Sequence, residues 1–355
     1  MGISKDKKHK KTVPPEKNVE KLLEKAAENI NKLNPEAALL FCKRALDLSP
    51  NDADIMDMTA ELYLECEKPE LAFPLLVKST TVAPNSNFTK WMYLAQLSEG
   101  TDSLNCLKKG SELLSLEINK PENKENKQDL MNQLCQAYCS IAEMYTTDLC
   151  ELPEAESECY NYLSKSLTVN PNHIETLILL GSCRMSQCRE EEAEEACMRA
   201  TEAINKCKED TPELLPAYDS RFFLAKMLLE IPDDNTIKQR NNACIDIFDT
   251  LLLENDENEE VWWYITNCYY NIHKYTSALE FGNGCKTRVE KKYKQLQIPE
   301  IQAQVDAINQ LLSDIQTDLN NGKQDSEDEE DINTPQGDDM EEEEEEEEEE
   351  MDVEM

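Results

Sequence analysis

The sequence has little glycine and histidine and lacks the motifs of common enzymes. Of its 355 residues, 8 are glycine and 3 are histidine. Strands joined by tight turns normally use more glycine, so the composition favours helix. The histidines have no cysteine or carboxylate partner at catalytic spacing, and phosphate-loop, nucleophile-elbow and Cys-x-x-Cys motifs are missing. We therefore predict a protein that is not an enzyme and has no cofactor and no metal site.

Long apolar runs are missing as well. No stretch approaches the roughly 18 apolar residues of a membrane span, and the lysine-rich N-terminus lacks the apolar core of a signal peptide. The 14 cysteines follow no disulfide-framework spacing, which is typical of reduced thiols packed as small hydrophobic residues. A basic run from Lys5 to Lys11 resembles a nuclear-import signal. We expect a protein of the cytoplasm and nucleus without membrane contact.

Negative charge dominates the chain but is unevenly spread. The formal net charge is −38, and the segment from Asp325 onward has 20 acidic residues and no basic one. The preceding residues still carry a net charge of −18. Such a chain repels phosphate backbones, so direct nucleic-acid binding is disfavoured and a basic protein partner is favoured.

A repeat of 34 residues organises the chain. The segments AALLFCKRALDLSPN and LAFPLLVKSTTVAPN are similar in build and reach their closing prolines at Pro50 and Pro84. Small residues stand twelve and five positions before each proline: Ala38 and Ala45, then Ala72 and Ser79. Small residues at this spacing let the second helix of a hairpin approach its neighbours closely, and the proline ends that helix.

The pattern returns further along, at Pro171, at Gly181 and in the segment VWWYITNCYYNIHKYTSALEFGNGCK. These residues resemble the tetratricopeptide family, whose unit has 34 residues. The resemblance implies an all-α, right-handed superhelical solenoid of about seven helical hairpins. Apolar residues spaced from Ile301 to Leu319 predict a final amphipathic helix that covers the exposed end.

Three regions are expected along a monomeric chain. Residues 1–15 form a basic disordered N-terminal tail, residues 16–320 form the repeat array with its capping helix, and residues 321–355 form an acidic disordered tail. The tail contains ten consecutive glutamates and has too few apolar residues to build a core.

The family resemblance also implies a binding surface, because the first helix of each tetratricopeptide unit lines a concave groove. The implied client-binding residues are seven acidic positions and three aromatic anchors: Asp54, Asp57, Glu61, Glu65, Glu99, Glu143, Glu175, Phe222, Trp263 and Tyr270. Lys226 is the only cation that we place in this groove. An acidic groove with aromatic anchors suits an extended basic segment. The alternative is that these carboxylates only solvate exposed helices.

An acidic repeat array followed by an acidic tail is similar to the family of chaperones dedicated to large-subunit ribosomal protein four. This resemblance implies a chaperone that binds a basic segment of the newly made ribosomal protein and escorts it to pre-ribosomes. Two alternatives stay open: a scaffold subunit of a multiprotein assembly, and a histone chaperone. The sequence does not separate ribosomal proteins from histones as clients, because both are basic.

Overall fold

The computed structural model describes residues 18–210, 215–232 and 235–326. The predicted basic tail and all but the first six residues of the predicted acidic tail lie outside the described residues. The chain divides into two compact units, one ending at Val261 and one beginning at Trp262. Each unit is described by itself below.

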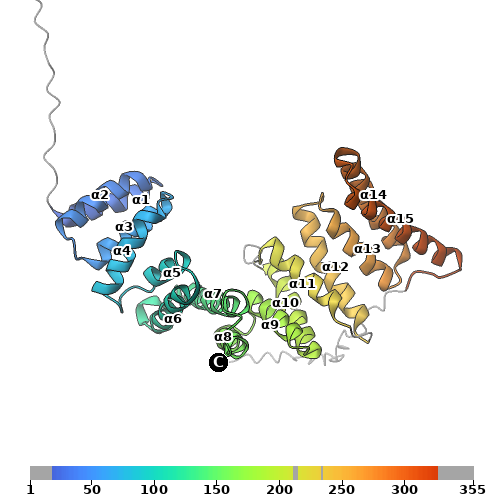
Figure 1. Ribbon diagram of the computed structural model, residues 1–355, viewed down its shortest axis with the longest axis horizontal. Coiled ribbons are helices and arrows are strands. Elements are labelled where there is room, and N and C mark those ends of the chain that lie inside the picture. Colours follow the sequence, from blue (N-terminus) through green and yellow to red (C-terminus); the bar gives the residue numbers. More distant parts are fainter. Residues whose placement is uncertain (1–17, 211–214, 233–234, 327–355) are drawn as a thin grey trace, which may run out of the picture. The chain divides into compact units, whose positions relative to one another are not determined.

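The first unit consists of six antiparallel helical hairpins that follow one another along the chain (Figure 1). The hairpins are α1 (Val19–Ile30) with α2 (Pro35–Leu48), α3 (Ala53–Glu65) with α4 (Pro69–Val82), α5 (Thr89–Gln96) with α6 (Gly100–Glu117), α7 (Lys127–Thr146) with α8 (Ala155–Val169), α9 (Ile174–Ser186) with α10 (Glu190–Asp210), and α11 (Tyr218–Glu230) with α12 (Ile237–Glu254). The connection between α6 and α7 is polar but contains regular structure. A 3-10 turn occupies Pro121–Asn123, and α7 already begins at Lys127.

The second unit contains most of α13 (Glu259–Asn271), followed by α14 (Tyr275–Leu296) and α15 (Pro299–Asn320). The helix α15 packs on α14 and buries Ile301, Val305 and Ile308 in a cluster with Cys285 and Val289. It is the amphipathic capping helix predicted from the sequence. The all-α fold of about seven hairpins with a capping helix is therefore confirmed.

The small residues of the repeat lie where their spacing predicts. Ala38, Ala45, Ala72 and Ser79 are all fully buried between helices. Nine of the 14 cysteines are also buried, and none of the 14 forms a disulfide. Small side chains at these positions let neighbouring helices approach closely, which lets successive hairpins share one continuous core.

Several hairpin turns use residues other than glycine in the left-handed conformation, which is consistent with the low glycine content. Four of them contain a non-glycine residue in the left-handed region, namely Leu33, Glu67, Cys188 and His273 at φ of 53°, 57°, 55° and 62°. Each stands two positions before the first residue of the second helix. A residue in the left-handed conformation after a helix lets the following backbone N–H groups donate hydrogen bonds to the last carbonyl oxygens of that helix. This position is usually occupied by glycine. The familiar glycine signal is therefore missing from these four turns, whereas Gly100 takes a left-handed conformation where α6 begins.

The extensive helix contacts are local in sequence. Within each unit, the helices in extensive contact are neighbours in the chain or have one element between them, as in α1 with α2, α2 with α3, and α7 with both α8 and α9. Contacts of this kind define a solenoid, in which each hairpin is stabilised by its immediate neighbours.

A substitution at Gly181 on α9 tests how closely the helices of a hairpin pack. A Cβ atom added there would lie 2.6 Å from Sγ of the buried Cys197 on α10. We expect Gly181→Ala to lower the free energy of unfolding by about 1–3 kcal/mol through overpacking. The same substitution in a Cys197→Ala background should cost much less, because the obstructing sulfur is gone. Chemical denaturation of the four chains measures this coupling, and equal costs in both backgrounds would contradict it.

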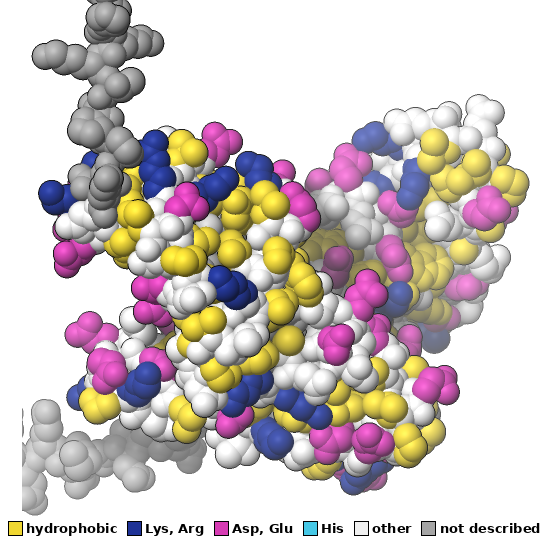
Figure 2. Space-filling view, turned by 60° about the vertical axis from the view of Figure 1, so that its left-hand side comes forward, with side chains coloured by type: hydrophobic (Ala, Val, Ile, Leu, Met, Phe, Trp, Pro, Cys, Tyr) yellow, Lys and Arg dark blue, Asp and Glu magenta, His cyan; other side chains and the backbone are white. Residues whose placement is uncertain are grey.

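The surface of the N-terminal hairpins is partly apolar. Large apolar side chains are exposed on α2 and α4, among them Leu40, Leu71, Phe73 and Val77. These hairpins come forward in Figure 2, where yellow side chains are numerous between the charged ones. No described helix is both long and apolar enough to cross a membrane.

Candidate client-binding face

Three hollows follow the first helices of the hairpins in the first unit. The acidic hollow lies among α1, α3, α4 and α5 and has a volume of about 290 Å³; it is lined by Ile30, Asp54, Asp57, Met58, Glu61, Leu76, Asn87, Thr89, Lys90 and Tyr93. The middle hollow, of about 480 Å³, lies among α5, α6 and α7 and includes Met92, Gln96 and Glu143. The third hollow, of about 550 Å³, lies beside α7 and α9 and includes Gln136 and Glu175. Since Gln133 and Gln136 line both of the last two hollows, these form one continuous surface.

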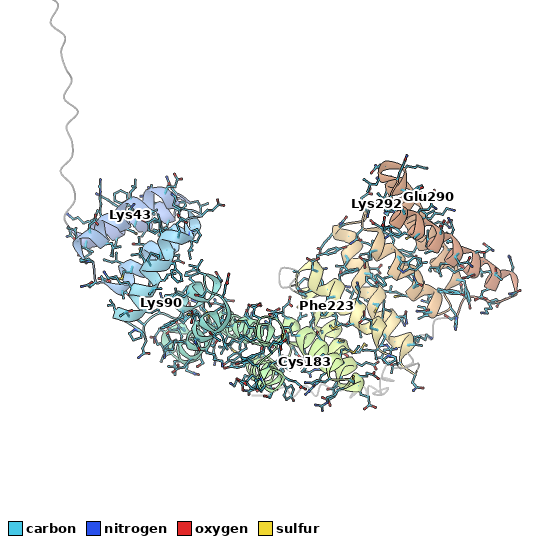
Figure 3. The ribbon with its side chains drawn as sticks, viewed as in Figure 1. Lys43, Lys90, Cys183, Phe223, Glu290 and Lys292 are labelled. Atoms are coloured by element: carbon cyan, nitrogen blue, oxygen red, sulfur yellow. The ribbon has the colours of Figure 1, made fainter. Side chains whose placement is uncertain are left out.

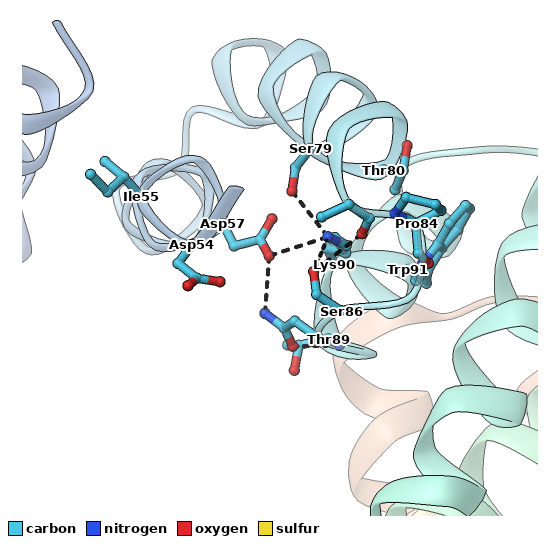
Figure 4. A network of polar contacts seen from close by, with 12 residues as sticks. Asp54, Ile55, Asp57, Ser79, Thr80, Pro84, Ser86, Thr89, Lys90 and Trp91 are labelled. Atoms are coloured by element: carbon cyan, nitrogen blue, oxygen red, sulfur yellow. Dashed lines mark hydrogen bonds and ion pairs between the residues drawn. The ribbon is translucent and has the colours of Figure 1, made fainter. Parts of the chain in front are cut away.

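The acidic hollow contains a buried ion pair that the sequence did not reveal. Lys90 is 1% exposed and lies against α4 (Figure 3), with its ammonium 3.6 Å from Oδ2 of Asp57. The same ammonium donates to the hydroxyl oxygens of Ser79 and Ser86 at 3.2 and 2.9 Å (Figure 4). Asn87 donates to Oδ2 of Asp57 at 3.2 Å. The expectation that Asp57 offers a free groove carboxylate is therefore wrong, since it is 7% exposed and paired with Lys90.

Asp54 and Glu61 differ from Asp57 because both are exposed on α3. Neither forms an ion pair with a described residue. The Tyr93 hydroxyl on α5 donates to Oε1 of Glu61 at 3.0 Å, which fixes the carboxylate at the rim of the hollow. Burial and the negative charge of Glu61 raise the pKa of Tyr93 to about 12, so its hydroxyl stays a donor at neutral pH.

Glu143 and Glu175 bring two negative charges together on neighbouring first helices. Surrounding protein atoms raise the pKa of Glu143 above its usual value, and the charge of Glu175 adds to this effect. The charged form of Glu143 is therefore held at an energetic cost in the free protein. A cation placed between the two carboxylates would relieve that cost.

Replacing Glu143 with glutamine is expected to stabilise the fold. Because the folded-state pKa of Glu143 is raised, stability is lost as the pH rises through this pKa, and the cost is present in full at neutral pH. We expect Glu143→Gln to raise the melting temperature at pH 7 by about 1–3 °C, a small gain because the side chain is partly exposed. The gain should shrink as the pH falls through the raised pKa. Calorimetry from pH 4 to 7 tests this, with the exposed Glu195→Gln on α10 as a control that should show no gain.

Glu65 and Glu99, the other two acidic residues predicted to bind the client, line none of the three hollows. Glu65 is exposed at the last position of α3, and its charge acts on Tyr93. Glu99 was expected on the first helix of the third hairpin, and this placement is wrong. The helix α5 ends at Gln96, so Glu99 lies in the turn as the N-cap residue of α6.

The three aromatic residues predicted as anchors are half-buried within their own units. In the first unit, the ring of Phe222 packs against the buried Phe248 with centroids 6.2 Å apart. In the second unit, Trp263 packs on the cluster formed by α14 and α15. The Tyr270 hydroxyl donates to Asp318 of α15 at 3.0 Å. Client anchoring by these residues stays a prediction, because all three already contact a neighbouring helix.

The sequence did not predict a role for Lys90 and Tyr93, which both lie on α5. The only feature of the sequence that could have indicated these two residues is their position on the first helix of a hairpin. Lys226, predicted as the only groove cation, lies 3.4 Å from Glu260 and is thus paired with a carboxylate.

In the described part of the chain, no group of three or more His, Cys, Asp or Glu residues is arranged to hold a metal ion. His173 is the N-cap of α9, and burial lowers its pKa.

The fold defines the chain as an all-helical tetratricopeptide-type scaffold, with acidic side chains along the first helices of its hairpins. It is similar to two proteins described as probable assembly chaperones of rpl4. One, from Schizosaccharomyces pombe, is 29% identical over 272 residues, which cover 74% of this chain and 77% of that protein. The other, from Emericella nidulans, is 26% identical and covers 68% of this chain and 62% of that protein.

A solved structure of an assembly chaperone of RpL4 shares the fold. It superposes with a TM-score of 0.61 at 22% identity and covers 72% of this chain and 97% of that one. No family model matches the sequence. The predicted resemblance to the assembly chaperones of ribosomal protein four is thus confirmed, and this similarity supports a non-enzymatic role.

Proposed function

We propose that this protein is a dedicated chaperone of large-subunit ribosomal protein four. It binds a basic segment of the newly made protein on the acidic face of its first helices and escorts it to pre-ribosomes. The observation that carries the proposal is the row of hollows on α3, α5, α7 and α9, with Asp54, Glu61, Glu143 and Glu175 at their walls. The relatives' described role supports the identity of the client.

The chemistry of this face favours a protein client over other ligands. Carboxylates attract lysine and arginine, while glutamine side chains and the methionines Met92 and Met144 offer hydrogen bonds and apolar contact to an extended chain. The same negative charge repels nucleic acid. We further propose that the protein acts as a monomer, in the cytoplasm and nucleus, without membrane contact and without catalysing a reaction.

Purification of the tagged protein after brief labelling of nascent chains tests this function. We expect one newly made ribosomal protein, the large-subunit protein four, at near-equal stoichiometry by mass spectrometry. Enrichment of histones instead would support a histone chaperone. A stable complex of several subunits without ribosomal proteins would support a scaffold subunit and refute the proposal.

A further inference from the structure

The acidic hollow has a charge imbalance that its own residues do not resolve. Three carboxylates line it, from Asp54, Asp57 and Glu61, against the single ammonium of Lys90. That ammonium is already committed to Asp57, Ser79 and Ser86 and is closed off from solvent. The hollow therefore keeps a net charge of about −2 at neutral pH.

One carboxylate oxygen in this wall also lacks a partner. Oδ1 of Asp57 is out of contact with solvent and accepts no hydrogen bond within the described part of the chain. Buried carboxylate oxygens are normally satisfied, and each one left unsatisfied has a free-energy cost. An unsatisfied carboxylate oxygen in the wall of this hollow leaves negative charge there that a cationic group in the hollow can compensate electrostatically.

The shape of the hollow matches a long side chain with a charged end. Ile30, Met58 and Leu76 contribute apolar wall that can pack against an aliphatic stem, while Asp54 and Glu61 stand at its exposed rim. Lysine and arginine have this combination of a methylene stem and a cationic head. A volume of about 290 Å³ has room for one such side chain. The carboxylates of the hollow do not form a group arranged to hold a metal ion, which argues against a divalent cation.

Tyr93 prepares the hollow for this ligand. Its hydroxyl holds Glu61 at 3.0 Å, so one oxygen of that carboxylate is oriented by the protein while the other stays available. Because the carboxylate is already fixed, less conformational entropy is lost when a cation binds.

We propose that the acidic hollow is a subsite for one basic side chain of the protein client. Asp54 and Glu61 bind its ammonium or guanidinium group, and the apolar wall packs against its stem. The inference rests on the proposed function for the identity of the client, but it concerns where and how that client is held. It assigns specificity to the second and third hairpins, because the hollow is complete only where α3 meets α5.

A direct titration tests the subsite without the client. The full chain labelled with [13C]methyl-methionine is titrated with the N-acetyl methylamides of arginine, lysine and glutamine. We expect the Met58 methyl signal to shift with arginine or lysine and not with glutamine, and the signal of Met227, a buried residue of α11, to stay unmoved. The larger shift tells which basic group the hollow prefers. An equal Met58 shift for all three compounds, or no shift at all, would overturn the proposal.

A second experiment uses large-subunit ribosomal protein four itself. Asp54→Asn with Glu61→Gln should weaken its binding about tenfold or more, whereas Asp47→Asn with Glu195→Gln, which neutralise exposed carboxylates on the second helices α2 and α10, should change it less than twofold. A photo-crosslinker at Met58 should capture a client segment that contains a lysine or arginine. If the wild type binds the client and both double variants bind it equally well, the subsite is refuted and the proposed function is left intact. A wild-type protein that does not bind the client, but whose Met58 signal responds to arginine or lysine, would refute the function and support the subsite.

Discussion

Lys90→Met is expected to destabilise the third hairpin and its contact with the second by about 3–5 kcal/mol. The substitution leaves the carboxylate of Asp57 buried without its counter-charge, and it removes the donor that satisfies Ser79 and Ser86. Hydrogen exchange followed by mass spectrometry measures the effect locally. Amides of α3, α4 and α5 should exchange faster, while those of α14 and α15 in the second unit serve as an internal reference.

A double variant separates charge from packing in this prediction. Asp57→Asn added to Lys90→Met removes the uncompensated charge, so we expect it to restore part of the lost protection. If the double variant is as unstable as the sum of the two single variants, the ion pair contributes nothing and the effect belongs to packing alone. Lys78→Met on α4 is a suitable control, because Lys78 is exposed and donates to the backbone oxygen of Pro50.

Reversing the charge of the neighbouring carboxylates on α7 and α9 is expected to have the largest effect on client binding. Glu143→Lys with Glu175→Lys changes the charge of the face by four and replaces attraction of a basic segment with repulsion. We expect the affinity for large-subunit ribosomal protein four to fall about 100-fold at roughly 0.1 M salt, and the salt dependence of binding to become weaker. Isothermal titration calorimetry at three salt concentrations measures both quantities.

The matched control for this variant lies on α10, the helix that forms a hairpin with α9. Glu195→Lys with Glu202→Lys makes the same charge change on two exposed positions of α10, the second helix. Its affinity should fall less than fivefold, because these residues line none of the hollows on the first helices. An equal loss in both variants would show that net charge, and not this face, determines binding. Circular dichroism confirms that each variant is folded.

The repeat was predictable from sequence because it rests on local physics. Prolines that end helices and small residues at close helix contacts recur with a fixed period, and Ala38, Ala72 and Gly181 lie in the packing positions that this period predicts. The face of each first helix was predictable for the same reason, and Asp54, Glu61, Glu143 and Glu175 line hollows on these faces. Client binding by these four residues stays a prediction.

Residue partners across helices were not predictable, because periodicity assigns a face and not a neighbour. The sequence does not show that Lys90 reaches back to Asp57, 33 positions earlier, and so it does not show that one groove carboxylate is already compensated. Nor does it show that α15 covers part of Trp263 and Tyr270. Glu99 was misplaced for a simpler reason: α5 is only 8 residues long, which periodicity alone does not reveal.

The locality of the helix contacts has a consequence for how the protein is made. Every wall of the acidic hollow comes from residues between Ile30 and Tyr93, and these helices pack on one another and on α6, which ends at Glu117. Low contact order allows such a segment to fold quickly as it leaves the ribosome, before the remaining two thirds of the chain are synthesised. The first element of the client-binding face would then be in place while translation of the chaperone itself is still under way.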